Sequence, residues 1–216
     1  MSATPADLAR AEQTVKDLSV SRLRRAFLIL MIVVLHLLCY GAVNRINSTR
    51  PEEAFVDWST SMDAWIPYLP WTWVFYYLGD LYILGVGAVV VWVLPRRKFY
   101  RAFYAYGGMV IAGAALQLLF PGQAPWPEEM SHVQAGVHSF ISMKPYACLP
   151  SMHVALTGLP AMMLFSITKS ATLRTLSTGA ALLITVSVVT MKEHYVLDAV
   201  TGVLLAVMFY ALWRRR

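Results

Sequence analysis

The chain alternates long apolar stretches with shorter polar or charged segments. About 20 apolar residues in helical conformation are enough to cross the hydrocarbon core of a bilayer. The fold class we expect is therefore an all-α integral membrane protein, a bundle of six transmembrane helices. The predicted helices are Ala26–Val43, Trp71–Leu94, Ala102–Phe120, Leu149–Thr168, Ala171–Met191 and Tyr195–Trp213.

Composition agrees with the pattern: 58% of the residues are hydrophobic, 14% are charged, and the mean hydropathy is +0.55. Soluble domains are rarely so apolar. Because no long polar linker interrupts the chain, we expect one membrane domain over residues 26–216. Residues 1–25 would form a cytoplasmic segment, either an amphipathic helix on the inner leaflet or a disordered tail.

The net charge of +6 reflects topology rather than a nucleic-acid partner. In a six-helix topology all but four of the 18 basic residues fall on one side of the membrane. Cytoplasmic loops carry an excess of Lys and Arg, so both termini are predicted to be cytoplasmic. The four exceptions, which would lie outside, are Arg45, Arg50, Lys144 and Lys192.

A histidine and an aspartate open the last apolar stretch. His194 and Asp198 stand four residues apart, a spacing that puts two side chains on one face of a helix. The carboxylate could then fix the imidazole tautomer and leave the other ring nitrogen free to attack an electrophile. The alternative is a structural His–Asp pair at the end of the helix. Ionisable groups at membrane depth usually mark functional sites, but the pair alone does not decide between the two.

A second histidine opens the fourth stretch, in the motif Pro150-Ser151-Met152-His153. Since the chain crosses inward and returns between the motifs, both histidines are predicted to reach the same outer face. Pro150 suits a first helical turn and Ser151 suits an N-cap, so N–H groups there could bind an anion. One histidine as nucleophile and the other as proton donor would form a complete set for phosphoryl transfer.

Pro-Ser-x-His followed about 40 residues later by His-x-x-x-Asp resembles the type 2 phosphatidic acid phosphatase superfamily. The chain is most similar to the inositol phosphorylceramide synthase-related branch, from about Asp57 onward. The segments that carry this resemblance are Asp63–Pro70, Phe120–Trp126, Pro150–Ala155 and His194–Gly202.

The resemblance implies a six-helix membrane enzyme with an outward-facing site that works without metal or cofactor. It assigns His194 as the nucleophile, Asp198 as its orienting partner and His153 as the general acid. The related bacterial proteins of this branch imply a multi-pass protein of the bacterial inner membrane. The expected partners are a lipid phosphoester and an alcohol acceptor.

Three cations of the usual phosphatase pattern are missing. The family's first motif has Lys and Arg where this chain has Gln117 and Ala124, and the arginine of its third motif is Val188. A phosphomonoester dianion benefits most from such cations, whereas a diester carries one charge. We therefore expect transfer of a phospho-headgroup. The alternative in the same fold is a phosphatase for lipid phosphates or polyprenyl diphosphates.

Replacement phosphate ligands can be sought on the same face. We predict Lys192, two residues before the proposed nucleophile, together with Ser151 and Gln117. Gln117 could instead bond to a neighbouring helix. Lys144, Arg45 and Arg50 are weaker choices, and an ordinary solvated charge is the simpler explanation of Lys144.

Several other polar residues stay open at this point. Asp80 lies within the second stretch and could belong to a headgroup pocket or to a buried structural bond. Cys39 and Cys148 both lie toward the outer face, where a disulfide or two free thiols are possible. The remaining histidines have no potential partner at a spacing typical of a site, and we expect them to be structural or solvent-exposed. They are His36, His132 and His138.

Two alternatives concern the same three residues. The side chains of His153, His194 and Asp198 are of types that could bind a metal ion, but three ligands are a weak signal and the resemblance argues against a metal site. A proton-coupled transporter could use the same residues as a relay. No matching pair of Gly- or Pro-broken helices suggests the inverted repeats of such transporters.

Overall fold

The computed structural model describes residues 20–127, 129–141 and 146–215. Among these residues the secondary structure is helical, with no β-strand. Five helices are long and apolar enough to cross a membrane, as a multi-pass membrane protein requires. They are α2 (Arg22–Asn47), α4 (Trp73–Val93), α5 (Arg96–Leu119), α8 (Ala171–Thr190) and α9 (Val196–Arg214).

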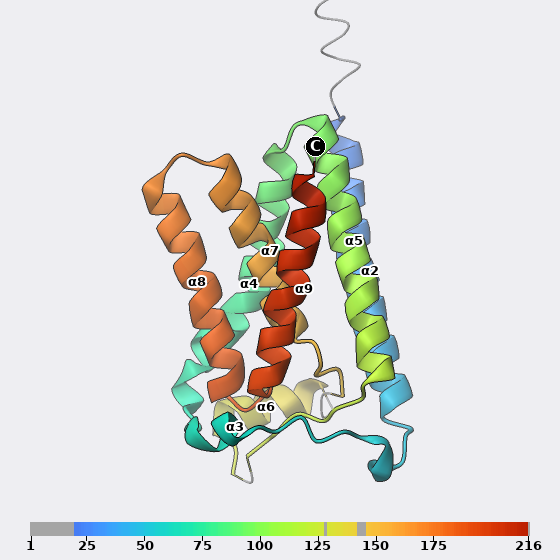
Figure 1. The fold of residues 1–216 in the computed structure, drawn as a ribbon, viewed down its shortest axis with the longest axis vertical. Helices are drawn as coiled ribbons and strands as arrows, with labels where there is room; N and C mark the ends of the chain where they lie inside the picture. The colour runs from blue at the N-terminus through green and yellow to red at the C-terminus, as the bar shows by residue number, and fades with distance from the viewer. Residues whose placement is uncertain (1–19, 128, 142–145, 216) are drawn as a thin grey trace, which may run out of the picture.

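The fourth predicted span corresponds to a shorter helix, α7 (Met152–Ile167), of 16 residues. At 1.5 Å per residue it is about 24 Å long, less than the hydrocarbon core of an average bilayer. Six full-length spans are therefore not confirmed. In Figure 1 α7 lies between α4, α8 and α9, and nine of its residues are buried. Its central position buries more than half of the helix, although Phe165 near its C-terminal end is 52% exposed.

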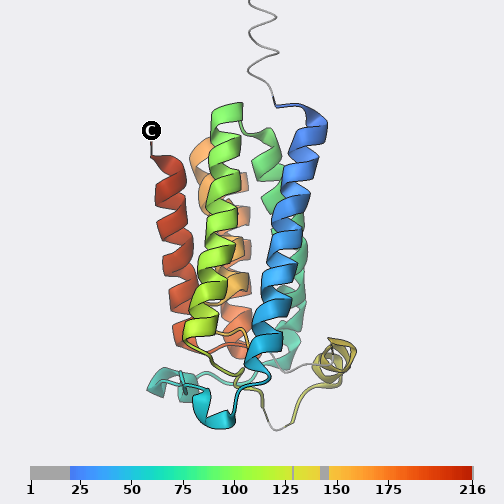
Figure 2. The same cartoon turned by 90° about the vertical axis from the view of Figure 1, so that its right-hand side faces the viewer.

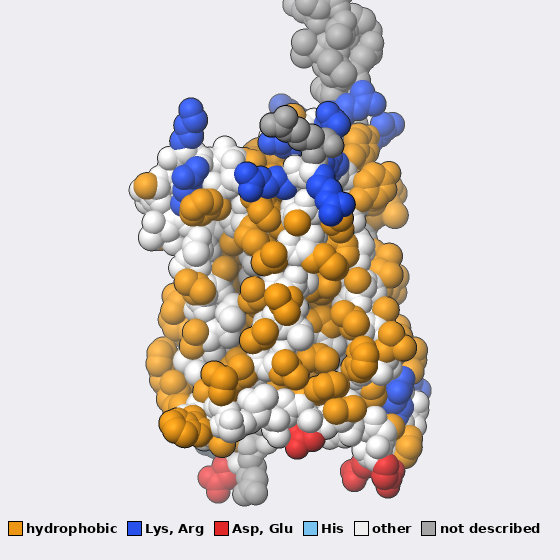
Figure 3. All heavy atoms as spheres, viewed as in Figure 1, with side chains coloured by type: hydrophobic (Ala, Val, Ile, Leu, Met, Phe, Trp, Pro, Cys, Tyr) orange, Lys and Arg blue, Asp and Glu red, His pale blue; other side chains and the backbone are white. Residues whose placement is uncertain are grey.

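The two ends of the bundle differ in chemistry. The described chain begins and ends at one end, where Lys and Arg side chains gather, whereas acidic side chains gather at the other (Figures 1 and 3). The short helices η1 (Glu52–Ala54), α3 (Ser61–Trp65), η2 (Pro70–Thr72) and α6 (His132–Ile141) all belong to the connections at the acidic end (Figure 1). The basic end is the one that the positive-inside rule would place in the cytoplasm, and this orientation stays a prediction.

Helix boundaries differ from the prediction by up to six residues. The predicted helix Ala102–Phe120 corresponds to α5, which starts at Arg96 directly after its N-cap, Pro95. Arg and Lys are good helix formers, so charge alone did not mark a loop. Similarly, α2 begins at Arg22 with Ser21 as its N-cap and absorbs the end of the segment assigned to residues 1–25. Residues 1–19 lie outside the described part of the chain.

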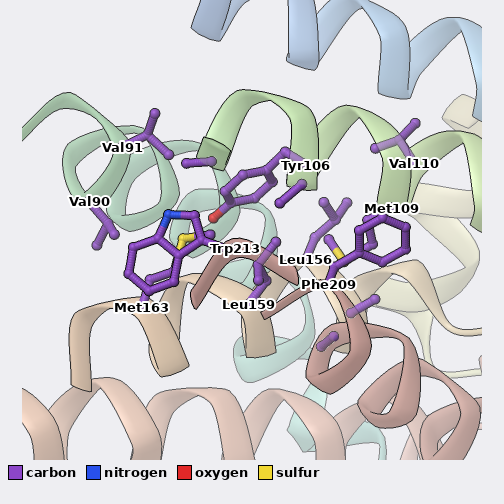
Figure 4. Packing of buried hydrophobic residues seen from close by; sticks show 14 of the residues in the cluster. Val90, Val91, Tyr106, Met109, Val110, Leu156, Leu159, Met163, Phe209 and Trp213 are labelled. Atoms are coloured by element: carbon purple, nitrogen blue, oxygen red, sulfur yellow. The ribbon is translucent and has the colours of Figure 1, made fainter. Parts of the chain in front are cut away.

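The largest core cluster joins α5, α7 and α9 with the inner face of α4 (Figure 4). Phe99, Met109, Leu159 and Met163 are among its fully buried side chains. Helix α2 packs along α5 at the edge of the bundle and buries few of its own residues (Figure 2). Since lipid is as apolar as these side chains, the bundle is stabilised mainly by close packing and interhelical hydrogen bonds.

Close packing is most demanding where α7 begins beside α9. A Cβ atom on Gly202 would lie 2.5 Å from the carbonyl oxygen of Ser151 and 3.0 Å from the Cβ of Val154. At the same place the backbone N–H of Ser151 donates to the carbonyl of Asp198 over 2.9 Å. Glycine at position 202 therefore allows the first turns of the two helices to touch.

We expect Gly202→Ala to destabilise the protein by about 1–3 kcal/mol, because the added methyl group meets a backbone atom that cannot rotate away. The matched control is Gly179→Ala in α8, where an added Cβ has no heavy atom within 4 Å. The control should be neutral or stabilising by about 0.5–1 kcal/mol, from helix propensity alone. Thermal unfolding of both variants in the same detergent measures the difference, and equal midpoints would contradict the packing argument.

Candidate active site

The first half of the site is the turn that leads into α9. His194 lies just before the N-cap residue Tyr195, so it is not on the helix as the spacing had suggested. Its Nδ1 atom nevertheless lies 3.3 Å from Oδ2 of Asp198. The backbone N–H of His194 donates to the carbonyl of Val188, which fixes the turn against the end of α8. The predicted His–Asp contact is present, but the turn rather than helical periodicity produces it.

Asp198 is fully buried, and its two carboxylate oxygens differ in their hydrogen bonds. Oδ2 faces the imidazole of His194 and also accepts the backbone N–H of Tyr195 at 3.0 Å, which caps the helix. Oδ1 is buried and has no hydrogen-bond partner among the described residues. A buried carboxylate held in this way can fix the orientation of a neighbouring imidazole.

The second half of the site is the first turn of α7. Ser151 is the N-cap, as predicted, and its hydroxyl accepts the N–H of Val154. Pro150 was expected inside the first turn, but it precedes the cap and follows a cis peptide bond. His153 stands two residues after Ser151, and its ring lies near that of His194 in the turn before α9. Its ring centroid lies 6.4 Å from that of His194, with the planes at 65°.

An aspartate from α4 completes the surroundings of His153. Oδ1 of Asp80 lies 3.2 Å from Nε2 of His153, and the ring of Tyr76 lies 4.6 Å from the imidazole, centroid to centroid. The side chain of Asp80 is 56% exposed, so the interpretation as a buried structural residue is wrong. Each histidine therefore has its own carboxylate, and only one of the two pairs could be read from sequence spacing.

Both histidines line a cavity of about 460 Å³ between α2, α4, α5 and the start of α7. Its lining is mainly apolar and also includes four tyrosines, Asp80 and Glu193. Leu37 of α2 and Leu84 of α4 also line it and are 61% and 50% exposed, so the cavity reaches the lateral surface of the bundle. Such a site can accept an apolar chain from the side and hold a polar group at the histidines.

No lysine or arginine is among the described residues that line this cavity. Of the predicted phosphate ligands, only Gln117 lines it, and its amide Nε2 donates to the carbonyls of Ala147 and Pro150. Lys192 donates from Nζ to the carbonyls of Asp63 and Ile66, at 2.9 and 2.7 Å. The hydroxyl of Ser151 accepts the capping N–H of Val154, and this side chain is buried and does not line the cavity. A phosphate-binding role for these three residues stays a prediction.

Two of the weaker candidate cations, Arg45 and Arg50, are not among the residues that line the cavity. Arg50 donates to the carbonyl of Leu118 at the end of α5, and the exposed Arg45 lies in the last turn of α2. Lys144 lies outside the described residues.

In the connection before α3, the N–H of Ser59 donates to the exposed carboxylate of Asp57. This hydrogen bond lowers the pKa of Asp57, so this side chain is negatively charged at neutral pH.

Sequence reasoning missed Glu193 and His36. Glu193 is 1% exposed, lines the cavity, and accepts from the amide of Gln134 at 2.6 Å and from the indole of Trp126 at 3.1 Å. The only sign in the sequence was its position between Lys192 and His194, where a glutamate is also expected as an ordinary charged residue of a solvated loop. His36 lines the cavity from α2, although its sequence neighbours gave it no partner. His132 is exposed, and the side chain of His138 is not described.

The cysteines are not joined, and one of them belongs to the site. Cys39 and Cys148 form no disulfide. A sulfur of Cys148, a nitrogen of His194 and an oxygen of Asp198 lie within 4.8 Å of one another. All three residues are buried. The metal-ligand types noted in the sequence were His153, His194 and Asp198, with the histidine in place of Cys148.

Comparison with known families shows which family the chain belongs to. Residues 49–212 match the PAP2 superfamily, a segment that contains both histidine motifs. The chain belongs to the PAP2 superfamily. No curated protein and no solved structure matches it. Membership in the PAP2 superfamily supports a phosphatase-type membrane enzyme that acts on lipid phosphoesters, and leaves transfer and hydrolysis undistinguished.

We expect Glu193→Gln to loosen the connection between α5 and α7. The new amide presents an N–H2 group to one of two donors, Gln134 or Trp126, and a mismatched buried donor costs about 1–3 kcal/mol. Hydrogen exchange of residues 129–141 should therefore be faster in this variant. The control is Glu53→Gln on the exposed η1 helix, which should leave exchange unchanged. Equal exchange in both variants would show that Glu193 does not anchor this segment.

Proposed function

We propose that this PAP2 superfamily member transfers a phospho-headgroup from a phospholipid to a lipid or sugar alcohol, through a phosphohistidine on His194. The reaction would take place at the extracytoplasmic face, at the end of the bundle opposite the basic residues. The resemblance to the inositol phosphorylceramide synthase-related branch supports this choice, as does a lateral cavity that suits a lipid chain. A bacterial inner membrane is the proposed location.

The observation that carries the choice of a diester is the charge of the cavity wall. Its described lining includes two carboxylates, Asp80 and Glu193, and no lysine or arginine. A phosphomonoester dianion would have three free oxygens to neutralise and would be repelled by these groups. A diester bears a single negative charge, and the polar groups of its headgroup can donate to the carboxylates. The wall therefore favours a diester donor.

In the first step a nitrogen of His194 attacks phosphorus while the bond from phosphorus to the lipid alcohol breaks. His153, held by Asp80, gives its proton to the departing oxygen. Asp198 keeps the imidazole of His194 oriented and balances the positive charge that forms on it. The free lipid alcohol and a phosphohistidine that carries the headgroup are the products of this step.

In the second step an acceptor hydroxyl takes the place of the departed alcohol. His153, now neutral, removes the hydroxyl proton as the acceptor oxygen attacks phosphorus. The bond between phosphorus and His194 breaks, and the new diester leaves along the cavity. The same residues catalyse both steps because the second is the reverse of the first with a different alcohol.

The direct test offers purified protein phosphatidylinositol and other diesters, phosphatidate and a polyprenyl diphosphate, with and without ceramide or diacylglycerol. We expect a new phosphodiester lipid that requires the acceptor, detected by phosphorus NMR and lipid mass spectrometry. His194→Ala should abolish it without unfolding the protein. Inorganic phosphate from the monoester or diphosphate, released equally without acceptor, would instead establish a phosphatase.

A second test isolates the role of His153. With a natural donor, His153→Gln should lower kcat by about 10²–10⁴-fold, because the departing alkoxide needs a proton. With a p-nitrophenyl diester, whose leaving group needs none, phosphoenzyme formation should return to within about tenfold of the wild-type rate. His194→Ala is the control and should fail with both donors. An equal loss by His153→Gln on both donors would contradict its role as general acid.

A further inference from the structure

Three side chains of different chemistry meet beside the proposed nucleophile. Cys148 comes from the extended segment before α7, His194 from the turn before α9, and Asp198 from the first turn of α9. One ligand atom from each lies within 4.8 Å of the other two. They are 1%, 6% and 0% exposed. The phosphoryl-transfer scheme uses His194 and Asp198 but assigns nothing to the thiol.

A second observation points to a missing ligand at this cluster. Oδ1 of Asp198 is buried without a hydrogen-bond partner, while Oδ2 carries both the imidazole contact and the helix cap. An unpartnered buried carboxylate oxygen costs free energy comparable to a lost hydrogen bond to a charged group. A cation bound at Oδ1 would remove that cost and leave the cap on Oδ2 intact.

The ligand types define the class of cation. Sulfur, imidazole nitrogen and carboxylate oxygen together suit Zn²⁺ and similar borderline transition ions, with bond lengths of about 2.0–2.3 Å. Mg²⁺ and Ca²⁺ prefer oxygen ligands alone and are disfavoured by the thiolate. Three protein ligands also leave a fourth tetrahedral position for water. The three ligand atoms, now within 4.8 Å of one another, would have to move closer together to reach such a geometry.

We propose that Cys148, His194 and Asp198 form a binding site for Zn²⁺ or a similar transition-metal ion, and that occupancy inhibits the enzyme. The thiol loses its proton to solvent on binding, and a ring nitrogen of His194 donates its lone pair to the metal. Coordination of the metal by either ring nitrogen of His194 would inhibit the enzyme. Coordination at Nδ1 removes the orienting contact with Asp198, and coordination at the other nitrogen blocks attack on phosphorus. Binding does not depend on the proposed function, whereas inhibition rests on it.

The chain offers an internal control, because it contains two cysteines and only one belongs to the cluster. Cys39→Ser leaves the site untouched and makes Cys148 the single thiol. Co²⁺ is the optical probe, since a thiolate bound to Co²⁺ gives an intense charge-transfer absorption in the near ultraviolet. We expect this band, at one Co²⁺ per chain, in the purified wild-type protein and in Cys39→Ser. Zn²⁺ should displace the Co²⁺ and abolish the band.

Cys148→Ser should lose the band and weaken Zn²⁺ binding by at least about tenfold, since even second-shell changes at metal sites cost 10–100-fold. Equilibrium dialysis measures the affinity, and thermal unfolding confirms that the variant is folded. If Cys148→Ser does not fold, the band in Cys39→Ser still decides the assignment. Absence of the band there, or Zn²⁺ affinity unchanged in a folded Cys148→Ser, would overturn the site.

Turnover then tests inhibition separately from binding. Zn²⁺ should inhibit the wild-type protein and Cys39→Ser equally, at least about tenfold more strongly than Cys148→Ser, and Mg²⁺ should have no effect. Stoichiometric binding in a protein that processes no phospholipid would leave the metal site standing and refute the proposed function. Turnover that is unaffected or raised by a bound Zn²⁺ ion would overturn the inhibitory role.

Discussion

The contact between the first turns of α7 and α9 is the constraint on which the site depends. It rests on a backbone hydrogen bond from Ser151 to Asp198 and on the absence of a side chain at Gly202. His153 stands two residues after Ser151, and Asp198 is the partner of His194. This backbone contact therefore sets the distance between two histidines that are separated in the sequence by most of α7 and by α8.

The parts that sequence could predict are those with a local signal. Apolar stretches located the long helices to within a few residues, and the motifs around His153 and His194 were correctly expected to meet. These features need only a hydropathy pattern and the topology it implies. The boundaries failed where local signals conflict, as at Arg96, where a run of basic residues precedes the apolar stretch although such residues favour a helix.

The rest of the site depends on contacts between distant segments, which no spacing reveals. Asp80 meets His153 only because α4 packs against α7, and Gln117 supports the segment before α7 from the far end of α5. Lys192 illustrates the converse. Its position beside His194 suggested a phosphate ligand, yet the backbone at this residue has φ of 59° and its side chain is directed to carbonyls near α3. Local conformation, not proximity along the chain, determines what such a residue contacts.

The lateral cavity also determines which measure of substrate concentration applies to this protein. Its wall includes Leu37 and Leu84, both on the outer surface of the bundle, so a lipid would arrive from the bilayer rather than from water. Saturation is then governed by the mole fraction of the lipid among its neighbours in the membrane, and total molarity has little meaning. Bulk detergent or inert lipid, added at constant amounts of protein and substrate, acts as a diluent in two dimensions.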